Sequence, residues 1–478
     1  MIPEHYDLIV IGSGPAGEKG AAQAAYFGKR VALVEKEPFL GGAAANTGTL
    51  PSKTLRETAV FLSGFRQREL YGLDVGVKKK VQVRDFLTRE RYITDQERLR
   101  VRENLHRHHV TLFRGTASFV DEHTVAVTPD RCPELHLRGE VILIATGSYP
   151  HRPPGFPFHD PRLYDSDTLL TLQEIPGTLL VVGGGVIGCE YACIFAALGS
   201  HVTVVEKRGA IAGGMDAEVS EALREQMAAA GVRFFLNDGV ESVECDGVVS
   251  ARLCSGEVVR AHAVLVSAGR CGQTAALGLD RLGVAANERG QVRVNAHFQT
   301  SVPHVYAAGD VIGNPALAST AMEQGRLAMA HAFDLKYKKA VAPVLPYGMY
   351  TIPECAMAGL TEEALAEAKV PYVVGRASYG GNARGRIIGD VKGFLKLLFH
   401  EDDMKLLGVH VIGEQATELV HVGLTALLMN AGADLFINTC YNYPTLTELY
   451  KYATYDALGR QAARLKEREA AQPDEGQP

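Results

Sequence analysis

The sequence contains no long apolar segment and no leader-like start. No stretch reaches about 18 uninterrupted apolar residues, the length that a membrane-spanning helix needs. The first residues, MIPEHYD, lack the basic segment and apolar core of a signal peptide. The net charge of −6 gives no general attraction for nucleic acid or for an anionic membrane. We therefore expect a cytoplasmic protein with neither a membrane nor a nucleic acid as partner.

The cysteines are few and widely scattered. The chain has eight, at positions 132, 189, 193, 245, 254, 271, 355 and 440, and no spacing suggests a disulfide scaffold or a zinc site. This usage fits a reducing compartment and predicts no metal centre. Cys189 and Cys193 lie one helical turn apart, which favours small buried residues on a helix that packs against a sheet.

Length and composition indicate several globular domains. With 478 residues, and about 150 residues in an ordinary domain, the chain is expected to form about three. It is 46% apolar and 22% charged, and its 50 glycines fit a fold with many strand-to-helix turns.

A glycine-rich turn follows the first apolar run. The run LIVI is typical of a buried strand, and Gly12, Gly14 and Gly17 lead from it into a helical pattern. Glycines at such a turn let the backbone approach a pyrophosphate, whose charge then lies at the helix N-terminus. A second apolar strand delivers Glu35, 23 positions after Gly12, where a carboxylate accepts the hydroxyls of an adenosine ribose.

The same pattern returns later in the chain. The run LLVV ends in Gly183, Gly185 and Gly188, and a helix and a second strand then lead to Glu206, again 23 positions after the first glycine. Two complete series are improbable by chance, so the sequence predicts two dinucleotide cradles. A further strand, AVLVSAG, ends at Gly269 and is expected to close the second cradle.

Two other strands end in small or acidic residues. The run VILIATG ends in Thr146 and Gly147, which suits a buried strand whose carboxyl end touches a ligand. The run HVYAAGD ends in Asp310, where a carboxylate can hold the polyol of a flavin chain and can also cap a helix.

The C-terminal third of the chain has a different pattern. From about residue 343, strands such as FLKLLFH and LLGVHVIG are mixed with helices, which predicts a third domain of α+β type. Residues 466–478 are polar and predict a flexible tail.

Together these motifs give a resemblance that covers nearly the whole chain. The sequence resembles the flavoprotein disulfide reductases, which include dihydrolipoamide dehydrogenase and glutathione reductase. The resemblance is carried by GSGPAG with Glu35, PSK at 51–53, ATG at 145–147, GGGVIG with Glu206, AAGD at 307–310, and the terminal YPTLTE.

The resemblance implies an α/β fold with two Rossmann-like dinucleotide-binding domains, for FAD and for NAD, and a C-terminal α+β dimerisation domain. It implies a homodimer that works on nicotinamide nucleotides. The implied segments are 1–150 and 274–342 for the FAD domain, 151–273 for the NAD(P) domain, 343–465 for the interface domain, and 466–478 for the tail.

The resemblance also implies which residues hold each cofactor. The FAD residues would be Gly12, Gly14, Pro15, Ala16, Gly17, Glu35, Lys36, Gly42, Lys53, Thr146, Gly147, Asp310 and Ala318. The NAD(P) residues would be Gly183, Gly185, Val186, Ile187, Gly188, Glu206, Lys207 and Gly269. Lys53 and Glu190 would pair beside the flavin and nicotinamide, where positive charge stabilises a reduced, anionic ring system.

The chain departs from the family at both positions of its dithiol chemistry. Ala44 and Thr49 stand where the family has two redox cysteines, and neither residue can form a disulfide. Tyr443 replaces the catalytic histidine, although its usual partner Glu448 remains. A tyrosine, with a pKa of about 10, is a poor proton shuttle at neutral pH. Electrons must therefore leave through the flavin itself.

Threonine and tyrosine at these two positions resemble the soluble pyridine nucleotide transhydrogenases, which normally retain the first cysteine. This resemblance implies that hydride moves between NAD(H) and NADP(H) through FAD in a ping-pong cycle. Tyr443 and Glu448 would reach the flavin pocket of the opposite subunit as positioning residues.

The identity of the second nucleotide stays open. Glu206 favours the free 2′-hydroxyl of NAD and repels the 2′-phosphate of NADP. Lys207 and Arg208 follow directly and either offset that repulsion or are solvated surface charges. Two alternatives therefore remain: an NADH-dependent diaphorase or oxidase that reduces a quinone, metal ion or oxygen, and a flavoprotein sensor that does not turn over.

Overall fold

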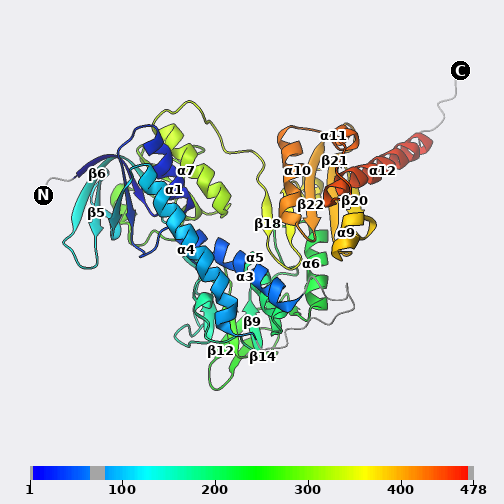
Figure 1. Ribbon diagram of the computed structural model, residues 1–478, viewed down its shortest axis with the longest axis horizontal. Coiled ribbons are helices and arrows are strands. Elements are labelled where there is room, and N and C mark those ends of the chain that lie inside the picture. Colours follow the sequence, from blue (N-terminus) through cyan, green and yellow to red (C-terminus); the bar gives the residue numbers. More distant parts are fainter. Residues whose placement is uncertain (1–3, 65–80, 472–478) are drawn as a thin grey trace. The chain divides into compact units, whose positions relative to one another are not determined.

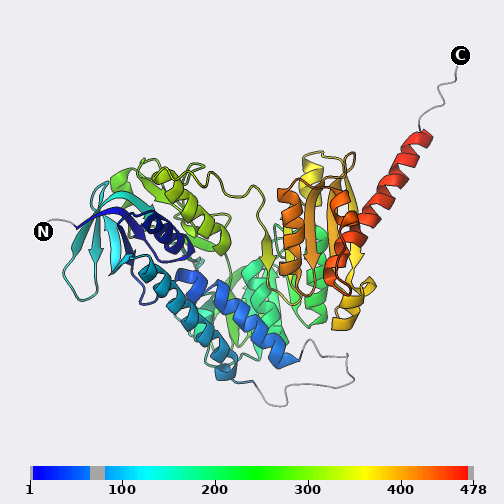
Figure 2. The ribbon, with the colours of Figure 1, turned by 45° about the horizontal axis from the view of Figure 1, so that its top comes forward.

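The computed structural model describes residues 4–64 and 81–471 (Figures 1 and 2). These residues form two compact units. The described residues of Met1–Leu55, Gln82–Glu174 and Leu265–Val341 belong to the first unit. Those of Arg56–Val81, Ile175–Val264 and Ala342–Pro478 belong to the second. Each unit therefore combines segments that lie far apart in the sequence.

A seven-stranded sheet forms the centre of the first unit. Its path runs β3 (Thr111–Arg114), β2 (Val31–Glu35), β1 (Glu4–Ile11), β6 (Leu135–Ile144), β5 (Thr124–Thr128) and β4 (Thr116–Phe119), and β17 (Val305–Ala307) also pairs with β6. Strands β1, β2, β3, β6 and β17 are parallel, whereas β4 and β5 are antiparallel. Leu8 lies opposite both Val31 and Val141 and is fully buried. A strand with neighbours on both sides explains the apolar run predicted at this position.

Helices α1 (Pro15–Tyr26) and α7 (Ala318–Ala332) pack side by side against this sheet (Figure 1). Their backbones approach closely at Gly325, where an added Cβ would lie 2.2 Å from the carbonyl oxygen of Ala16. The other helices are α2 (Gly42–Asn46), α4 (Val83–Arg107) and α3 (Thr49–Ser63), and the boundary between the units falls within α3. Short elements complete the unit: β7 (Ser148–Pro150), β8 (Leu163–Asp165), β16 (Arg270–Gly272) and the 3₁₀ helices Thr168–Thr171, Leu279–Leu282 and Asp310–Ile312.

The second unit contains the repeat of the strand, glycine turn and helix. Strand β10 (His201–Glu206) pairs in parallel with β9 (Thr178–Val182) and β11 (Arg233–Leu236). Helix α5 (Val186–Ala197) connects β9 to β10, and α6 (Ala217–Ala229) connects β10 to β11. An antiparallel sheet follows, of β12 (Val240–Glu244), β13 (Val249–Leu253) and β14 (Val258–Ala261), and then β15 (Ala263–Val266).

An antiparallel sheet forms the C-terminal part of the second unit. Its order is β18 (Tyr347–Met349), β19 (Cys355–Gly359), β22 (Leu406–Ile412), β21 (Phe394–His400) and β20 (Tyr372–Ser378). Its core includes Phe399 of the sheet, Phe436 of α11 and Tyr450 of α12. The helices are α8 (Glu362–Glu367), α9 (Ala383–Ile388), α10 (Ala416–Leu428), α11 (Ala433–Asn438) and α12 (Leu449–Ala471), with 3₁₀ helices at Tyr379–Gly381 and Leu446–Glu448.

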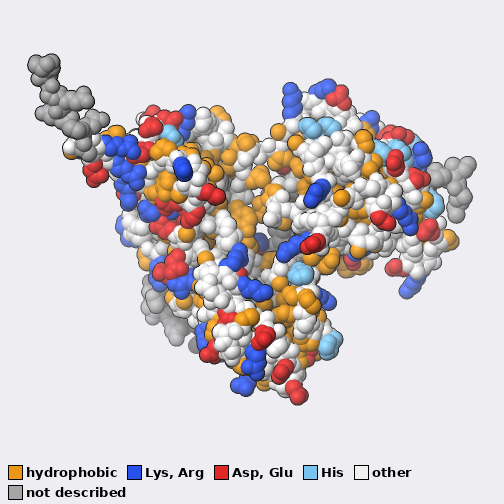
Figure 3. All heavy atoms as spheres, turned by 180° about the vertical axis from the view of Figure 1, so that it is seen from behind, with side chains coloured by type: hydrophobic (Ala, Val, Ile, Leu, Met, Phe, Trp, Pro, Cys, Tyr) orange, Lys and Arg blue, Asp and Glu red, His pale blue; other side chains and the backbone are white. Residues whose placement is uncertain are grey.

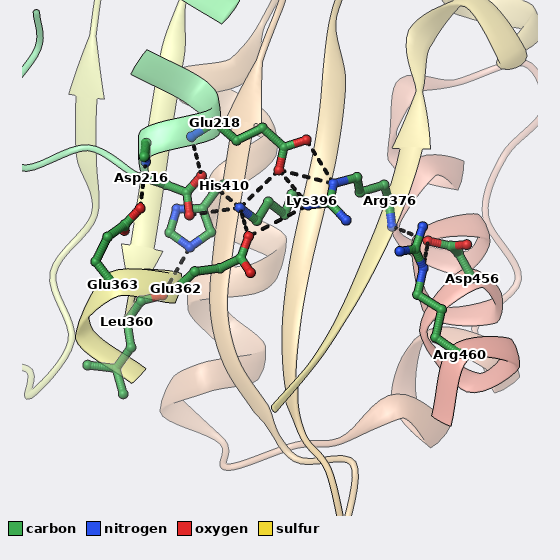
Figure 4. A network of polar contacts seen from close by, with 11 residues as sticks. Asp216, Glu218, Leu360, Glu362, Glu363, Arg376, Lys396, His410, Asp456 and Arg460 are labelled. Atoms are coloured by element: carbon green, nitrogen blue, oxygen red, sulfur yellow. Dashed lines mark hydrogen bonds and ion pairs between the residues drawn. The ribbon is translucent and has the colours of Figure 1, made fainter. Parts of the chain in front are cut away.

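A charge network around a buried lysine joins the N-terminus of α6 to this C-terminal sheet (Figure 4). Lys396 on β21 is 1% exposed, and its Nζ lies 2.8 Å from Asp216 Oδ1 and 3.0 Å from Glu218 Oε2. It also pairs with Glu362 of α8, and Arg376 of β20 binds Glu218 in turn. Burial lowers the pKa of Lys396, but its hydrogen bonds to Asp216 and Glu362 raise it above the ordinary value. The lysine is therefore held charged.

Three further observations concern the expected partners and the C-terminal tail. Within residues 4–64 and 81–471, no helix is long and apolar enough to cross a membrane, and no group of three or more metal-ligating side chains gathers. On the face drawn in Figure 3, basic and acidic side chains are intermingled rather than gathered by sign. Helix α12 continues to Ala471, so residues 466–471 of the predicted tail are helical, and residues 472–478 lie outside the described residues.

Candidate functional site

The first cradle lies where β1 turns into α1. Gly12 has a φ of 101°, and a Cβ there would lie 2.4 Å from the carbonyl oxygen of Ala145. A Cβ on Gly17 would lie 1.9 Å from the carbonyl oxygen of Gly12, so only glycine permits this crossing. No side chain of the described residues caps the N-terminus of α1 at Gly14, so its amide groups and positive dipole are available to an anion.

Glu35 ties the end of β2 to this glycine turn. Its Oε2 accepts hydrogen bonds from the Ser13 amide at 2.9 Å and from the Ser13 hydroxyl, and its Oε1 accepts one from the Glu37 amide at 2.9 Å. The Ser13 hydroxyl also accepts a hydrogen bond from the amide of Gly41. The acid predicted from its spacing is thus fixed at the rim of the turn.

Two features of the first unit fit a bound cofactor. The hydroxyl of Thr146 is buried and has no hydrogen-bond partner among the described residues, although buried polar groups are normally paired. Gly147, with a φ of 70°, and Gly14 adjoin open space or ordinary contacts only, so room remains beside the turn. A bound dinucleotide could hydrogen-bond to the Thr146 hydroxyl, and its phosphates could bind the uncapped N-terminus of α1.

Asp310 is held by a chain of polar contacts that sequence reasoning missed. Its Oδ2 accepts a 2.8 Å hydrogen bond from the Ser148 hydroxyl. The guanidinium of Arg270 donates to that hydroxyl from Nε at 2.8 Å and to the Ser148 carbonyl from Nη2 at 2.9 Å. Arg270 also pairs with Asp167 at 3.0 Å. Arg270 and Ser148 therefore orient the carboxylate predicted to hold the flavin chain.

Ser148→Ala is expected to weaken FAD binding about tenfold, because a hydrogen bond to a charged group contributes about 1.5–3 kcal/mol. Ser148→Thr retains the hydroxyl and should restore most of the affinity. Arg84→Ala, which removes an exposed arginine paired with Asp85 at the start of α4, serves as the matched control. The measurement is the FAD dissociation constant on reconstitution of apoprotein. Equal affinities for the alanine and threonine variants would refute a positioning role.

The second cradle repeats the first in the second unit. Gly183 has a φ of 106°, α5 starts at Gly185 without a side-chain cap among the described residues, and a Cβ on Gly185 would meet open space. Glu206 is 7% exposed, and its Oε2 accepts a 2.7 Å hydrogen bond from the Gly184 amide. Burial raises the pKa of Glu206, but the hydrogen bonds from Arg208 lower it below the ordinary value. The acid is therefore ionised at neutral pH.

Comparison with known proteins identifies the family. A model of the pyridine nucleotide-disulphide oxidoreductases matches residues 6–325, and a model of the dimerisation domain of the same group matches residues 345–454. The chain belongs to this family. Membership confirms the predicted fold class, the oxidoreductase class, FAD and a nicotinamide nucleotide as cofactors, and the homodimer.

Curated relatives cover nearly the full chain. The soluble pyridine nucleotide transhydrogenase of Mycobacterium bovis is 45% identical over 461 residues, which are 96% of this chain and 98% of that protein. Proteins of the same name are 41% identical in Chromohalobacter salexigens and 42% identical in Pseudomonas putida, over 96% of this chain and 100% of each relative.

Solved structures have a similar fold over most of the chain. LpdA from Mycobacterium tuberculosis has a TM-score of 0.87 at 26% identity, over 95% of this chain and 99% of that one. The Cu(II) complex of the HOCl-induced flavoprotein disulfide reductase RclA from Escherichia coli has a TM-score of 0.86 at 25% identity, with the same coverage.

Within this family framework, the remaining predicted residues fall in different parts of the chain. Lys53 on α3 donates to the Ser52 hydroxyl and belongs to the first unit. Glu190 on α5 is 3% exposed, accepts a hydrogen bond from the Tyr350 amide at 2.9 Å, and belongs to the second unit. Their pairing stays a prediction, as does the place of Gly269, which lies in the first unit while Glu206 lies in the second.

Three of the cysteines, Cys189, Cys193 and Cys355, are buried as free thiols. No disulfide joins any of the eight cysteines, all of which lie within the described residues. Burial raises the pKa of Cys189 and Cys355 well above the ordinary value and that of Cys193 to about 12, so these thiols stay protonated at neutral pH. The prediction that Cys189 and Cys193 are buried helix residues is confirmed.

Tyr443 and Glu448 lie on a surface segment between α11 and α12. Tyr443 is 75% exposed, and Glu448 is half-buried in the 3₁₀ helix Leu446–Glu448. A phenol that projects into solvent is available to another chain, and its predicted positioning role remains a prediction.

Proposed function

We propose that this chain catalyses soluble pyridine nucleotide transhydrogenation, in which hydride passes between NADPH and NAD⁺ through FAD without a redox disulfide. The observation that carries the proposal is the pair of intact cradles in a chain with Ala44 and Thr49 at the cysteine positions. The name shared by its curated relatives supports it.

The residues have the following proposed roles. The first cradle, with Thr146 and Asp310, holds FAD, whereas the second cradle, with Glu206, holds the nicotinamide nucleotide. FAD, when bound, supplies a carrier that accepts hydride from one nicotinamide and returns it to another. Lys53 and Glu190 place charge beside the reacting rings, and Tyr443 and Glu448 reach the opposite subunit.

The two nucleotides, NADPH and NAD⁺, would bind the second cradle one after the other. NADPH loses a hydride and leaves as NADP⁺, and NAD⁺ then enters the same cradle and leaves as NADH. The chain is not required to donate or accept a proton in this exchange, since hydride alone is transferred. This fits the loss of the catalytic histidine at Tyr443.

The domains would have the boundaries predicted from the sequence. Residues 1–150 and 274–342 would serve the FAD domain, 151–273 the NAD(P) domain and 343–465 the interface. The protein would act in the cytoplasm, where both nucleotide pools are available.

The test is a steady-state assay of the FAD-loaded enzyme with NADPH and thio-NAD⁺ under anaerobic conditions. The expected result is formation of thio-NADH at a rate that depends on bound FAD. A rate equal to that of the flavin-free control would reject the proposal. Rapid NADH consumption with quinone or oxygen, without exchange between nucleotides, would establish the diaphorase instead.

A further inference from the structure

The two cradles differ in the group that completes their strand-end carboxylate. In the first, Glu35 accepts hydrogen bonds from the amides of Ser13 and Glu37 and from the neutral hydroxyl of Ser13. In the second, the guanidinium of Arg208 donates to Glu206 from Nε to Oε1 at 3.0 Å and from Nη2 to Oε2 at 3.2 Å. The carboxylate expected to bind the ribose is therefore paired with a neutral group in the first cradle, at Glu35. In the second cradle, Glu206 is paired with a cation.

Arg208 and the backbone together saturate Glu206. The carboxylate also accepts hydrogen bonds from the amides of Gly184 and Arg208, which makes four in all. A carboxylate has about four lone-pair positions. A ribose hydroxyl can therefore bind Glu206 only when a guanidinium N–H withdraws.

The position of Arg208 is shaped by a glycine. A Cβ on Gly213 would lie 2.1 Å from Nη1 and 2.9 Å from Cζ of Arg208, so the guanidinium rests on bare backbone. Its side chain is nonetheless 57% exposed. Since little of the side chain is packed, the guanidinium can leave Glu206 without opening the core.

Lys207, the neighbour of Arg208, packs against a different turn. A Cβ on Gly239 would lie 3.1 Å from its Cε, so the lysine stem runs along the turn at Gly239 and Cys254. Of the two adjacent cations, Arg208 is therefore the one held against the ribose-binding carboxylate.

We propose that Arg208 determines the nucleotide range of the second cradle, an inference that rests on the proposed function. With NAD(H), the guanidinium yields one contact and Glu206 accepts the ribose hydroxyl. With NADP(H), it turns from Glu206 to the 2′-phosphate, which carries about two negative charges. It thereby offsets the like-charge contact between Glu206 and the 2′-phosphate. One cradle then accepts both nucleotides.

The test measures binding rather than turnover. Calorimetric titrations of the FAD-loaded enzyme use adenosine 2′,5′-bisphosphate and AMP as probes. In Arg208→Gln, the bisphosphate is expected to bind about tenfold more weakly or worse, the loss of a hydrogen bond to a charged group. AMP should bind at least as tightly as to the wild type, because Glu206 is released. The double variant with Glu206→Gln should regain part of the bisphosphate affinity, since the repulsion is removed.

Arg224→Gln is the matched control, because it removes a cation that pairs with Glu221 on α6 rather than with Glu206. It should change neither affinity by more than about twofold. Unchanged bisphosphate binding in Arg208→Gln, or a loss in Lys207→Gln instead, would overturn the inference. The proposed function is judged separately: a wild type that binds the bisphosphate through Arg208 but exchanges no hydride supports the inference and rejects transhydrogenation.

Discussion

Lys396→Met is expected to lower the free energy of unfolding by about 3–5 kcal/mol, the usual cost of removing one partner from a buried ion pair. The substitution leaves Asp216, which is fully buried, without its cation and strips Glu218 and Glu362 of a shared partner. Methionine fills most of the lysine volume, so the loss reports charge rather than a cavity. Urea unfolding followed by circular dichroism measures it.

Lys405→Met supplies the comparison. This lysine also pairs with an aspartate, Asp403 at 3.2 Å, but it is about half exposed. Surface pairs contribute about 0–1 kcal/mol, so the urea midpoint should hardly move. Equal midpoints for the two variants would mean that the network at Lys396 contributes no more than a surface pair.

Gly17→Ala is expected to yield protein with almost no bound FAD. The new methyl group would lie 1.9 Å from the Gly12 carbonyl oxygen, which belongs to the backbone of the turn itself. Relief requires α1 to move away from β1 and carries the helix amides out of place. Overpacking costs about 1–3 kcal/mol or more, so the FAD affinity should fall about 100-fold.

The comparison for this variant is Gly177→Ala, where a Cβ would meet only His262 at an ordinary 3.7 Å. That protein should retain its flavin absorbance. The measurement is the ratio of flavin to protein after purification. Full flavin occupancy in Gly17→Ala would show that the helix start is not the FAD cradle.

The two cradles could be predicted from the sequence because their determinants are local. The spacing of Gly12, Gly14 and Gly17, and of Glu35 after them, follows from one strand, one turn and one helix in direct succession. The structure places these residues as predicted, at the end of β1, the start of α1 and the end of β2.

Contacts between residues far apart in the sequence were not predictable in the same way. Arg270 meets Ser148 across 122 positions of sequence, so no local pattern connects them. Lys396 sits in the apolar strand FLKLLFH and gives no sign that carboxylates from α6 and α8 surround it.

The choice between Lys207 and Arg208 shows the same limit. Adjacent residues of one charge are equivalent in a sequence, and only the glycines at 213 and 239 distinguish where their stems can lie. Which cation faces the carboxylate therefore depends on contacts that come from later parts of the chain.

Electrons are expected to leave this chain through the flavin alone. An anaerobic titration of the FAD-loaded enzyme with dithionite tests it most directly, because each equivalent delivers the electrons that one flavin holds. We predict complete bleaching of the flavin absorbance after one equivalent per FAD, with no long-wavelength charge-transfer band. Uptake of a second equivalent, with a thiolate-to-flavin band at the midpoint, would contradict the account.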